Sequence, residues 1–491
     1  MTNTATELSP AEVAGQIHDH DFTMTIDGES VAGATLFDVE NPATGLTFAR
    51  APHCSDEQLD AAVTAAHRAF QTWRRDADAR RAALHRVADI LVDNAELLGT
   101  VVTLEQGKPR AEGIGDVLRS ADWFRYFADL DLGNLVMQDD DQGFVEVVHR
   151  PLGVVAGVIP WNQPMLMAAW KAAPALLAGN TIVLKPSSFT PLTSLLVGEL
   201  VRDALPAGVF NCVSGPEPLG SKLIAHPLVR KVSFTGSTEV GKGILRDTAA
   251  DLKRVTLELG GNDAAIVLDD ADPAEFAEAL FWAGFKNNGQ MCALIKRLYV
   301  PESRRADYTA ALAEIARSVT VGDGMDAATQ LGPLATAPHH RGIKALAAAT
   351  REAGASVAAG GSTTDGGGHF FTPMVVTDVT DTDAIVADEQ FGPILPVIGY
   401  DDVEDALARA NDTRFGLGGS VWGSDTDRAR EIASQLESGQ ASVNHHTRGI
   451  LPHLPFGGAK WSGIGVENGP WGYEAFTQLQ TIAGPARTRR A

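Results

Sequence analysis

Residues 231–261 read KVSFTGSTEVGKGILRDTAADLKRVTLELGG and contain one strand–helix–strand unit. The apolar run at 232–234 and the alternating segment at 254–259 are typical of buried strands. A helix is predicted between them, and one face of it is expected to carry Val240, Ile244, Leu245, Thr248, Ala249 and Leu252. Strands that alternate with helices indicate a parallel sheet covered by helices, so this unit predicts an α/β fold.

The same alternation continues on both sides of the unit. Short apolar runs bounded by glycine and proline predict strands at 154–159, 181–184 and 209–213. A second series of strands and helices is expected over 264–443. The pattern therefore extends the α/β prediction to most of the chain after residue 150.

The N-terminal third is predicted to be mainly helical. Ser55 and Gln58 form a capping-box pattern before the apolar row Leu59, Val63, Ala66, Phe70 and Trp73. A second helix is predicted over much of 80–105, with stop signals at Gly107 and Pro109. Residues 143–149 alternate in polarity and predict an exposed strand.

Composition excludes some classes of partner. The chain has 491 residues, with 40 Lys and Arg against 62 Asp and Glu, and a formal net charge of −22. Because binding to phosphate backbones depends on clustered positive charge, no nucleic-acid partner is expected. The three scattered cysteines form no Cys-x-x-Cys pair, which argues against structural zinc and favours a reducing compartment.

The sequence predicts neither a secretory signal nor a membrane span. The polar N-terminus lacks the basic and apolar regions of a signal peptide, so a cytoplasmic location is expected. The uncharged stretch 151–170 approaches the length of a membrane helix. However, Pro160, Asn162, Gln163 and Pro164 lie at its centre, where they would be costly in lipid, so the stretch is predicted to be buried within the protein.

Three short segments carry side chains suited to chemistry. At Gly236 and Ser237 a predicted strand turns into a helix, a geometry that aims backbone N–H groups at an anion; the alternative is an ordinary turn. Glu258 lies at the carboxyl end of a strand, where ligands bind in parallel sheets; the alternative is a solvated glutamate. Cys292 follows an Asn-Asn-Gly turn, where a thiolate could be reached; the alternative is a small buried side chain.

An ordered set of motifs decides between these alternatives. In chain order the motifs are GVIPWNQP (157–164), LKPS (184–187), FTGS (234–237), LELGG (257–261), NNGQMC (287–292), EQFGP (389–393) and PFGG (455–458). Together they resemble those of the NAD(P)-dependent aldehyde dehydrogenase superfamily over about residues 20–480. The resemblance implies a Rossmann-like cofactor domain, an α/β catalytic domain and a small β arm for oligomerisation.

The resemblance also implies catalytic roles for three residues. Cys292 corresponds to the nucleophile, and Glu258 to the general base. Asn162 corresponds to the amide that, with the backbone N–H of Cys292, stabilises the oxyanion. The implied reaction is oxidation of an aldehyde to the acid through a thiohemiacetal and a thioester, which Glu258-activated water hydrolyses. A coenzyme A-acylating semialdehyde dehydrogenase and a catalytically silent scaffold on this fold are the alternatives.

NAD or NADP is the implied cofactor, and no metal is expected. By resemblance, the residues that bind it are Ile159, Pro160, Trp161, Lys185, Ser188, Gly236, Ser237, Gly241, Leu259, Glu389 and Phe391. Many NAD-specific members have glutamate at the position of Ser188, where it repels a 2′-phosphate. Because serine is neutral, NADP+ is expected at least to be tolerated.

The substrate passage is expected to be largely apolar. The residues at matching positions are Gln163, Met167, Trp170, Lys286, Met291 and Phe456. Lys286 either attracts an aldehyde that bears a carboxylate or extends into solvent. Glu467, with Lys171, corresponds to a proton relay in some members, and the alternative is a structural ion pair.

Domain boundaries follow from the same resemblance. Residues 1–129 and 150–260 are expected to form the cofactor-binding domain, and 261–469 the catalytic domain. Residues 130–149 and 470–491 are expected to form the arm. Because an exposed strand needs an edge partner, a homodimer or homotetramer is predicted.

Overall fold

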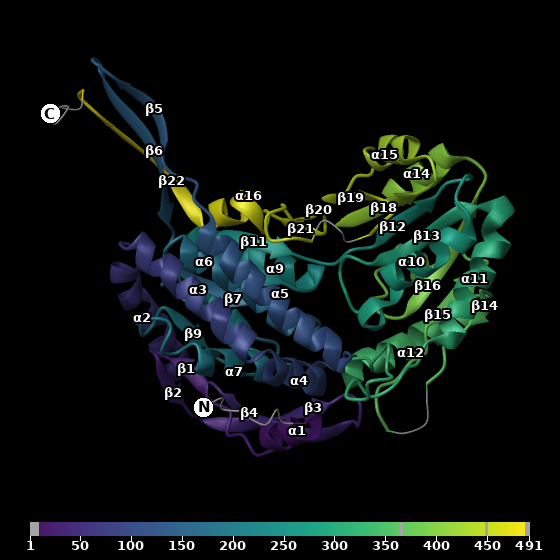
Figure 1. The fold of residues 1–491 in the computed structure, drawn as a ribbon, viewed down its shortest axis with the longest axis horizontal. Coiled ribbons are helices and arrows are strands. Elements are labelled where there is room, and N and C mark those ends of the chain that lie inside the picture. The colour runs from purple at the N-terminus through teal and green to yellow at the C-terminus, as the bar shows by residue number, and fades with distance from the viewer. Residues whose placement is uncertain (1–8, 364–366, 447–449, 487–491) are drawn as a thin grey trace, which may run out of the picture.

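The computed structural model describes residues 9–363, 367–446 and 450–486. Two large sheets, each covered by helices, lie on the two sides of the molecule, and a thin β arm projects from the side of the first sheet (Figure 1). The chain passes from the first sheet to the second through Gly260 and Gly261, which separate β11 (Arg254–Glu258) from β12 (Asp263–Val267). The predicted α/β class is confirmed.

The first sheet has the strand order β2-β1-β9-β8-β7-β10-β11-β21. Its other strands are β1 (Met24–Ile26), β2 (Glu29–Val31), β7 (Val154–Val158), β8 (Thr181–Lys185), β9 (Phe210–Cys212), β10 (Val229–Thr235) and β21 (Gly463–Ile464). The strands from β9 to β11 are parallel to one another, and the edge strands are antiparallel. Chain order runs outward in both directions from the neighbouring strands β7 and β10, which places a topological switch point between them.

The second sheet has the order β14-β15-β16-β13-β12-β18-β19. Its other strands are β13 (Ile295–Pro301), β14 (Ser356–Ala359), β15 (Met374–Thr377), β16 (Ile394–Tyr400), β18 (Gly418–Trp422) and β19 (Gln440–Val443). All of its pairings are parallel except that between β14 and β15. The second strand–helix series predicted from the sequence is therefore confirmed.

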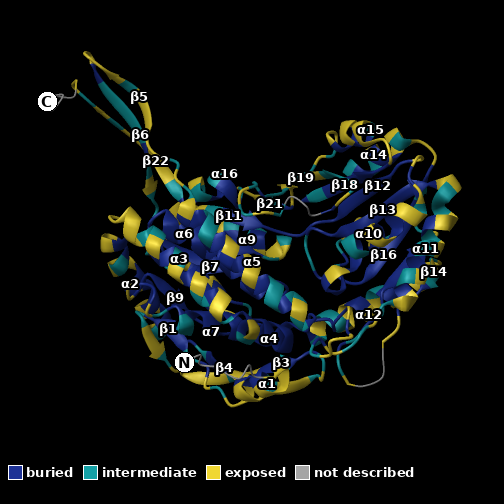
Figure 2. Cartoon of the chain, in the orientation of Figure 1, coloured by how far each residue is buried: buried dark blue, intermediate teal, exposed yellow. Residues whose placement is uncertain are grey.

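Helices cover both sheets. Those beside the first sheet are α2 (Asp56–Trp73), α3 (Ala77–Asp93), α4 (Ala95–Gln106), α5 (Arg110–Asp129), α6 (Pro164–Leu177), α7 (Leu192–Leu200), α8 (Leu219–Ala225) and α9 (Thr238–Thr248). Those beside the second are α10 (Pro273–Phe285), α11 (Arg305–Ser318), α12 (Ala337–Glu352), α13 (Ala384–Ala387), α14 (Val403–Asn411) and α15 (Thr426–Ala433). Burial is concentrated on the strands and on the helix faces turned toward them (Figure 2).

Short elements complete the fold. The three-stranded arm has the order β22-β6-β5, with β5 (Leu135–Asp140), β6 (Gly143–Pro151) and β22 (Thr477–Gly484). The remaining elements are α1 (Pro10–His18), β3 (Thr35–Asn41), β4 (Leu46–His53), β17 (Phe415–Gly416), β20 (Ala459–Lys460) and α16 (Gly469–Glu474). The pairing of β6 with β22 joins residues far apart in the sequence, Val145 with Ala483 for example.

Most local predictions are confirmed. Ser55 caps α2 and, with Gln58, forms a complete capping box. Gly107 ends α4 in the left-handed conformation, with φ of 99°. Residues 151–170 form β7 and the start of α6 and are largely buried. Across the described ranges, no helix combines the length and apolar character that crossing a membrane requires.

Two helix predictions are wrong in part. The single helix expected over 80–105 is two helices, because the Asn94 side-chain amide donates to the Ile90 carbonyl at 2.8 Å and competes with the helical ladder. The predicted apolar face of α9 is interrupted, because the helix ends at Thr248, whose hydroxyl bonds to the Ile244 carbonyl. Val240, near the start of the helix, and Leu252, beyond its end, are exposed, and Leu252 adopts φ of 51°.

Candidate active site

A cavity of about 240 Å³ lies at the switch point of the first sheet and opens toward the second sheet. Residues that follow β7, β10 and β11 line it, together with residues of two loops from the second half of the chain. The lining residues are Pro160, Trp161, Asn162, Thr235, Gly236, Ser237, Glu258, Leu259, Gly260, Cys292, His339, Glu389 and Phe391. Ligands bind outside the carboxyl ends of parallel strands at such a point, and here the three expected catalytic residues meet.

The turn before Cys292 explains the sequence of its motif. Asn287, Asn288 and Gly289 are all left-handed, with φ of 50°, 55° and 75°, a conformation that asparagine and glycine tolerate best. A side chain at Gly289 would place its Cβ 2.2 Å from the Gly392 carbonyl oxygen. Gln290 is fully buried and donates to the Asn287 carbonyl at 3.0 Å. These contacts hold the Cys292 loop in place and leave Cys292 only partly buried.

Asn162 is tied directly to this loop. Its Nδ2 donates to the Gln290 carbonyl at 2.8 Å, and its own carbonyl accepts from Nδ2 of Asn287 at 3.2 Å. A side-chain amide has two hydrogens, so one is left to point into the cavity. The arrangement therefore offers a positioned donor close to the Cys292 thiol.

Glu258 is 2% exposed, and neither oxygen of its carboxyl has a hydrogen-bond partner among the described residues. The solvated alternative for this residue is therefore wrong. Burial, aided by the charge of Glu467, raises the pKa of Glu258 to about 8. Burial and the neighbouring Glu258 carboxylate raise the pKa of the Cys292 thiol well above its usual value.

A buried ionic cluster lies behind Glu258. Nζ of Lys171 donates to the Thr235 hydroxyl at 2.6 Å and to Oε1 of Glu467, and both charged side chains are sealed from solvent. Oε2 of Glu467 has no partner among the described residues. The two residues therefore form an ion pair, and their role as a proton relay stays a prediction.

Sequence reasoning missed Lys231 and Thr235, which lie beside this cluster. Lys231 is 1% exposed and donates to the Thr256 hydroxyl, and burial lowers its pKa to about 7. The alternating pattern of β10 could have indicated that these two side chains share the face of Ser233. Nothing in the pattern, however, indicated that the Lys171–Glu467 pair lies against that face.

The expected cofactor residues divide into two groups. Pro160, Trp161, Gly236, Ser237, Leu259, Glu389 and Phe391 line the cavity. Ile159 is buried in the core, and Gly241 is required for packing, because a Cβ there would lie 2.6 Å from the Leu259 side chain. Ser237 caps α9, so the positive end of this helix faces the cavity.

Lys185 and Ser188 lie away from this cavity, at and after the carboxyl end of β8. Lys185 is 5% exposed, and burial lowers its pKa. Its Nζ lies 3.8 Å from the Glu217 carboxylate, which is itself largely exposed. Glu217 is a neighbour that the sequence motifs did not indicate.

Glu389 and Phe391 come from the loop before β16. The Glu389 carboxylate accepts from the Gly261 backbone N–H at 2.9 Å, and burial raises its pKa to about 7. The Phe391 ring lies edge-on to Trp161, with centroids 5.6 Å apart. His339, which sequence reasoning missed, lies 2.9 Å from the Phe391 carbonyl, and burial lowers its pKa to about 4, so it is neutral.

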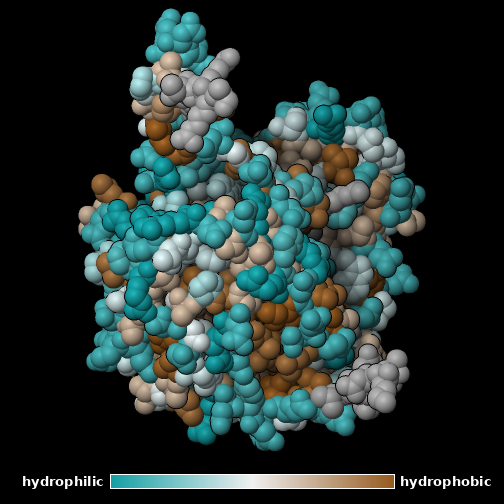
Figure 3. Space-filling model, turned by 60° about the vertical axis from the view of Figure 1, so that its left-hand side comes forward, coloured by the Kyte–Doolittle hydropathy of each residue, from teal (hydrophilic) through white to brown (hydrophobic). Residues whose placement is uncertain are grey.

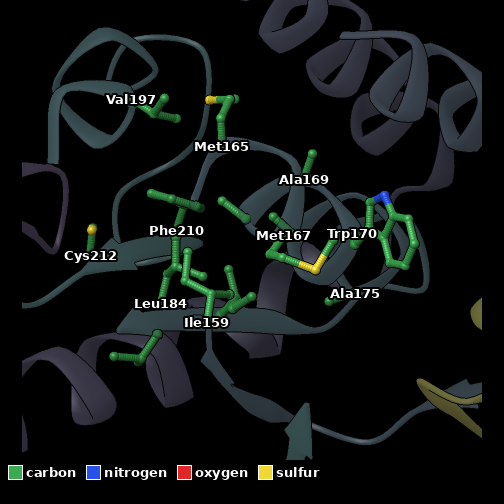
Figure 4. Close-up of a cluster of buried hydrophobic side chains, with 14 of the residues drawn as sticks. Ile159, Met165, Met167, Ala169, Trp170, Ala175, Leu184, Val197, Phe210 and Cys212 are labelled. Carbon is green, nitrogen blue, oxygen red and sulfur yellow. The ribbon is translucent and has the colours of Figure 1, made fainter. Parts of the chain in front are cut away.

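The expected substrate residues gather around α6. Met167 and Trp170 are buried on this helix among other apolar side chains (Figure 4). The Trp170 ring stacks on Trp123 and lies edge-on to Phe456, with centroid distances of 5.6 and 5.2 Å. Gln163 is 9% exposed. Met291 is partly buried, and Lys286 is exposed.

The described residues include no group of three or more His, Cys, Asp or Glu side chains placed to hold a metal ion. The cavity does suit a nicotinamide nucleotide: it combines the N-terminus of α9, which favours phosphate, with a partly exposed carboxylate and aromatic rings. A cavity of this kind, where two α/β sheets meet, is typical of a nucleotide-dependent enzyme.

Comparison with known proteins agrees with this class. The aldehyde dehydrogenase family model matches residues 29–482, and the chain belongs to this family. Phenylacetaldehyde dehydrogenase of Pseudomonas fluorescens is 40% identical, over 94% of this chain and 95% of that protein. The NADP+-dependent succinate-semialdehyde dehydrogenase of Escherichia coli is 37% identical, over 90% of this chain and 93% of that protein.

Solved structures agree as well. The NAD+ complex of aldehyde dehydrogenase from Bacillus cereus superposes with a TM-score of 0.94 at 34% identity, covering 98% of this chain and 99% of that chain. The protein is therefore an NAD(P)-dependent oxidoreductase that converts aldehydes to carboxylic acids. The family resemblance, the fold and the reaction class expected from the sequence are confirmed.

Proposed function

We propose that Cys292, Asn162 and Glu258 carry out this oxidation through a covalent intermediate on the Cys292 sulfur. The observation that carries the proposal is their convergence in one cavity: a reachable thiol, an amide with a spare hydrogen and a buried carboxyl without a partner. Each group supplies what one stage of the reaction needs, and each keeps an atom that is available to a bound substrate.

In the first stage, the Cys292 thiol loses its proton to solvent, and the thiolate sulfur attacks the aldehyde carbon and forms a C–S bond. The carbonyl oxygen becomes an oxyanion, which accepts hydrogen bonds from Asn162 Nδ2 and the Cys292 backbone N–H, each worth about 3–4 kcal/mol in comparable sites. Trp161, Ser237, Glu389 and Phe391 would hold a nicotinamide nucleotide, which when bound would favour the Cys292 thiolate by its positive charge and would supply the acceptor for the hydride that leaves carbon. A thioester on Cys292 remains.

In the second stage, Glu258 removes a proton from water as the water oxygen attacks the thioester carbon. The C–S bond breaks, the carboxylic acid leaves and the Cys292 sulfur is regenerated. We propose that Glu258 then passes this proton to the Lys171–Glu467 pair, which lies buried behind Glu258. This relay predicts that Lys171→Met changes the pH profile of kcat, and an unchanged profile would leave the pair a purely structural role.

Turnover with and without coenzyme A tests this function. An aldehyde panel with NAD+ or NADP+ should give free acid and reduced cofactor in equal amounts, and added coenzyme A should change neither. Formation of acyl-coenzyme A without free acid would instead support the acylating alternative. Cofactor binding without turnover across the panel would support a silent scaffold.

Cofactor choice gives a separate prediction. Ser188 is neutral, but the Glu217 carboxylate lies near Lys185 and opposes a 2′-phosphate there. We expect NADP+ to be accepted, and Glu217→Gln to raise the ratio of kcat/KM for NADP+ over NAD+ by about two- to fivefold, since an exposed charge contributes about 1 kcal/mol or less. A wild-type preference for NAD+ above about a thousandfold would contradict acceptance. An unchanged ratio in the variant would contradict the role of Glu217.

We propose that the β arm joins subunits into a homodimer or homotetramer. The arm stands away from the body (Figure 1). Its apolar side chains Leu135, Val136, Met137 and Leu479 are exposed. In the space-filling view, hydrophobic surface lies below a hydrophilic tip of the arm (Figure 3). An exposed edge strand of this kind needs a partner. Sedimentation that finds only monomers at micromolar concentration would contradict this proposal.

The domain division and the cellular location are also proposals. We propose residues 1–129 and 150–260 as the cofactor-binding domain, 261–469 as the catalytic domain, and 130–149 with 470–491 as the arm; 487–491 lie outside the described residues. The two large sheets support this division, except that β21, which lies within 261–469, pairs with the first sheet.

A cytoplasmic location is supported by three free cysteines, one of which must stay reduced to react. Cell fractionation tests this location.

A further inference from the structure

A buried lysine lies beside the expected substrate residue Gln163. Lys108 is 2% exposed, and its Nζ donates to Oδ2 of Asp116 at 2.6 Å and to Oε1 of Gln163 at 3.2 Å. The backbone N–H of Lys108 donates to Gln106, whose Nε2 in turn donates to Asn287 in the Cys292 loop. The turn at 106–108 therefore contacts both the Asn162–Gln163 segment and the nucleophile loop.

Lys108 fixes the direction of the Gln163 amide. An ammonium group can only donate hydrogen bonds, so the amide oxygen must face Lys108 and the NH2 group must point away from it. Gln163 is the N-cap residue of α6 but makes no capping bond. Within residues 9–363, 367–446 and 450–486, the side chain of Gln163 makes a hydrogen bond through Oε1 and not through Nε2. Gln163 thus presents two free donors next to Asn162.

A second donor without a partner lies on the same helix face. Gln163, Met167 and Trp170 are spaced i, i+4 and i+7, so they share one face of α6. Trp170 is 2% exposed, and its Nε1 has no partner among the described residues. Because buried donors are normally satisfied, the Trp170 Nε1 on the same helix face as the Gln163 amide indicates a ligand that brings acceptor oxygens.

Charge around Lys108 favours an anion. Lys108 and Arg119 share the single carboxylate of Asp116. The pKa of the buried Glu112 carboxyl is raised, mainly by its burial. The charges of Lys108, Lys286 and Arg119 all lie close enough to Glu112 to oppose that rise. Cations therefore outnumber anions at this wall, in a chain whose formal net charge is −22. Such local positive charge attracts an anionic substrate.

We propose that this wall selects aldehydes that carry a carboxylate, with the Gln163 amide donating to a carboxylate oxygen and Lys286 attracting the charge. The inference rests on the proposed function and adds the substrate class to it. It assigns Lys108 as a positioning residue, because Lys108 acts through the orientation of Gln163.

Succinic semialdehyde and butanal, which share a four-carbon chain, provide the test. The measured quantity is the ratio of kcat/KM for succinic semialdehyde over butanal, with NAD+ as cofactor. Gln163→Glu keeps an acceptor for Lys108 but loses both N–H donors and adds a negative charge. We expect the ratio to fall about 10- to 100-fold, the usual range for a lost hydrogen bond to a charged group.

Two further variants separate selection from folding. Lys286→Met changes an exposed side chain, and we expect it to lower the ratio about threefold or more by removing one nearby charge. Gln58→Glu is the matched control, because glutamate serves equally in the capping box of α2, outside the cavity, and should leave the ratio unchanged.

The outcomes are distinct. A wild-type preference for butanal, or an unchanged ratio in both Gln163→Glu and Lys286→Met, would overturn the inference while leaving the proposed function intact. Equal losses for both aldehydes would show a structural role only and would also overturn it. Failure of the proposed function would appear differently, as oxidation that persists in Cys292→Ala.

Discussion

Replacing Cys292 with alanine is expected to lower aldehyde oxidation by about four orders of magnitude or more, because Cys292 supplies the one thiol among the residues that line the cavity. Of the three cysteines, Cys292 alone is partly exposed, and burial raises the pKa of Cys54 to about 12. Cofactor binding should persist, since the elements assigned to it lie on β7, β10 and the loop before β16.

The measurement is steady-state reduction of cofactor, with cofactor binding followed by fluorescence. Cys54→Ala is the matched control: it removes a thiol that is 4% exposed, and it should lower stability without lowering the activity of folded protein. Undiminished oxidation by Cys292→Ala would end the covalent mechanism.

Alkylation offers a second readout of the same thiol. Burial and the Glu258 carboxylate keep Cys292 protonated in the free protein, so iodoacetamide should react slowly. Addition of NAD+ should speed the reaction at Cys292 and leave Cys54 and Cys212 unlabelled. Equal labelling of all three would contradict the special environment assigned to Cys292.

The elements that depend on local pattern could be predicted from the sequence. Strands β7 and β8 are buried on both faces, so each is a mainly apolar run in the sequence. The left-handed turn before Cys292 is likewise visible in its asparagines and glycine. These local signals, together with the motifs, located the residues that line the cavity.

Features that depend on distant contacts could not be predicted. The end of α9 is set by the Thr248 hydroxyl, and the break before α4 by the Asn94 amide, neither of which alters the apolar period. Lys108 reaches Gln163 across 55 positions of sequence, and only the folded chain shows that contact. The same holds for His339, whose helix gives no sign that it lies beside Phe391.

Glu258→Gln is expected to lower kcat by about 10²- to 10⁴-fold and to trap the thioester on Cys292. Glutamine has nearly the same shape as glutamate but cannot take a proton from water, so hydrolysis of the thioester should be slow. The earlier attack by Cys292 and the loss of hydride need no base at position 258 and should continue. Pre-steady-state mixing should therefore show a burst of reduced cofactor, followed by slow turnover. Mass spectrometry should find the acyl group on Cys292. Asn162 should keep its position, because its hydrogen bonds join it to Gln290 and Asn287 and not to Glu258.

The pH dependence sharpens this prediction. Because the pKa of Glu258 is raised to about 8, the base form grows as pH rises through that value, and wild-type kcat should rise with it when hydrolysis limits turnover. The folded protein also keeps a proton that the unfolded chain releases above its pKa of about 4.3. Glu258 thus lowers the free energy of unfolding progressively from about pH 4.3 to 8, a loss that Glu258→Gln removes. A variant that is inactive, shows no burst and is less stable than wild type at pH 8 would assign Glu258 a structural role in place of base catalysis.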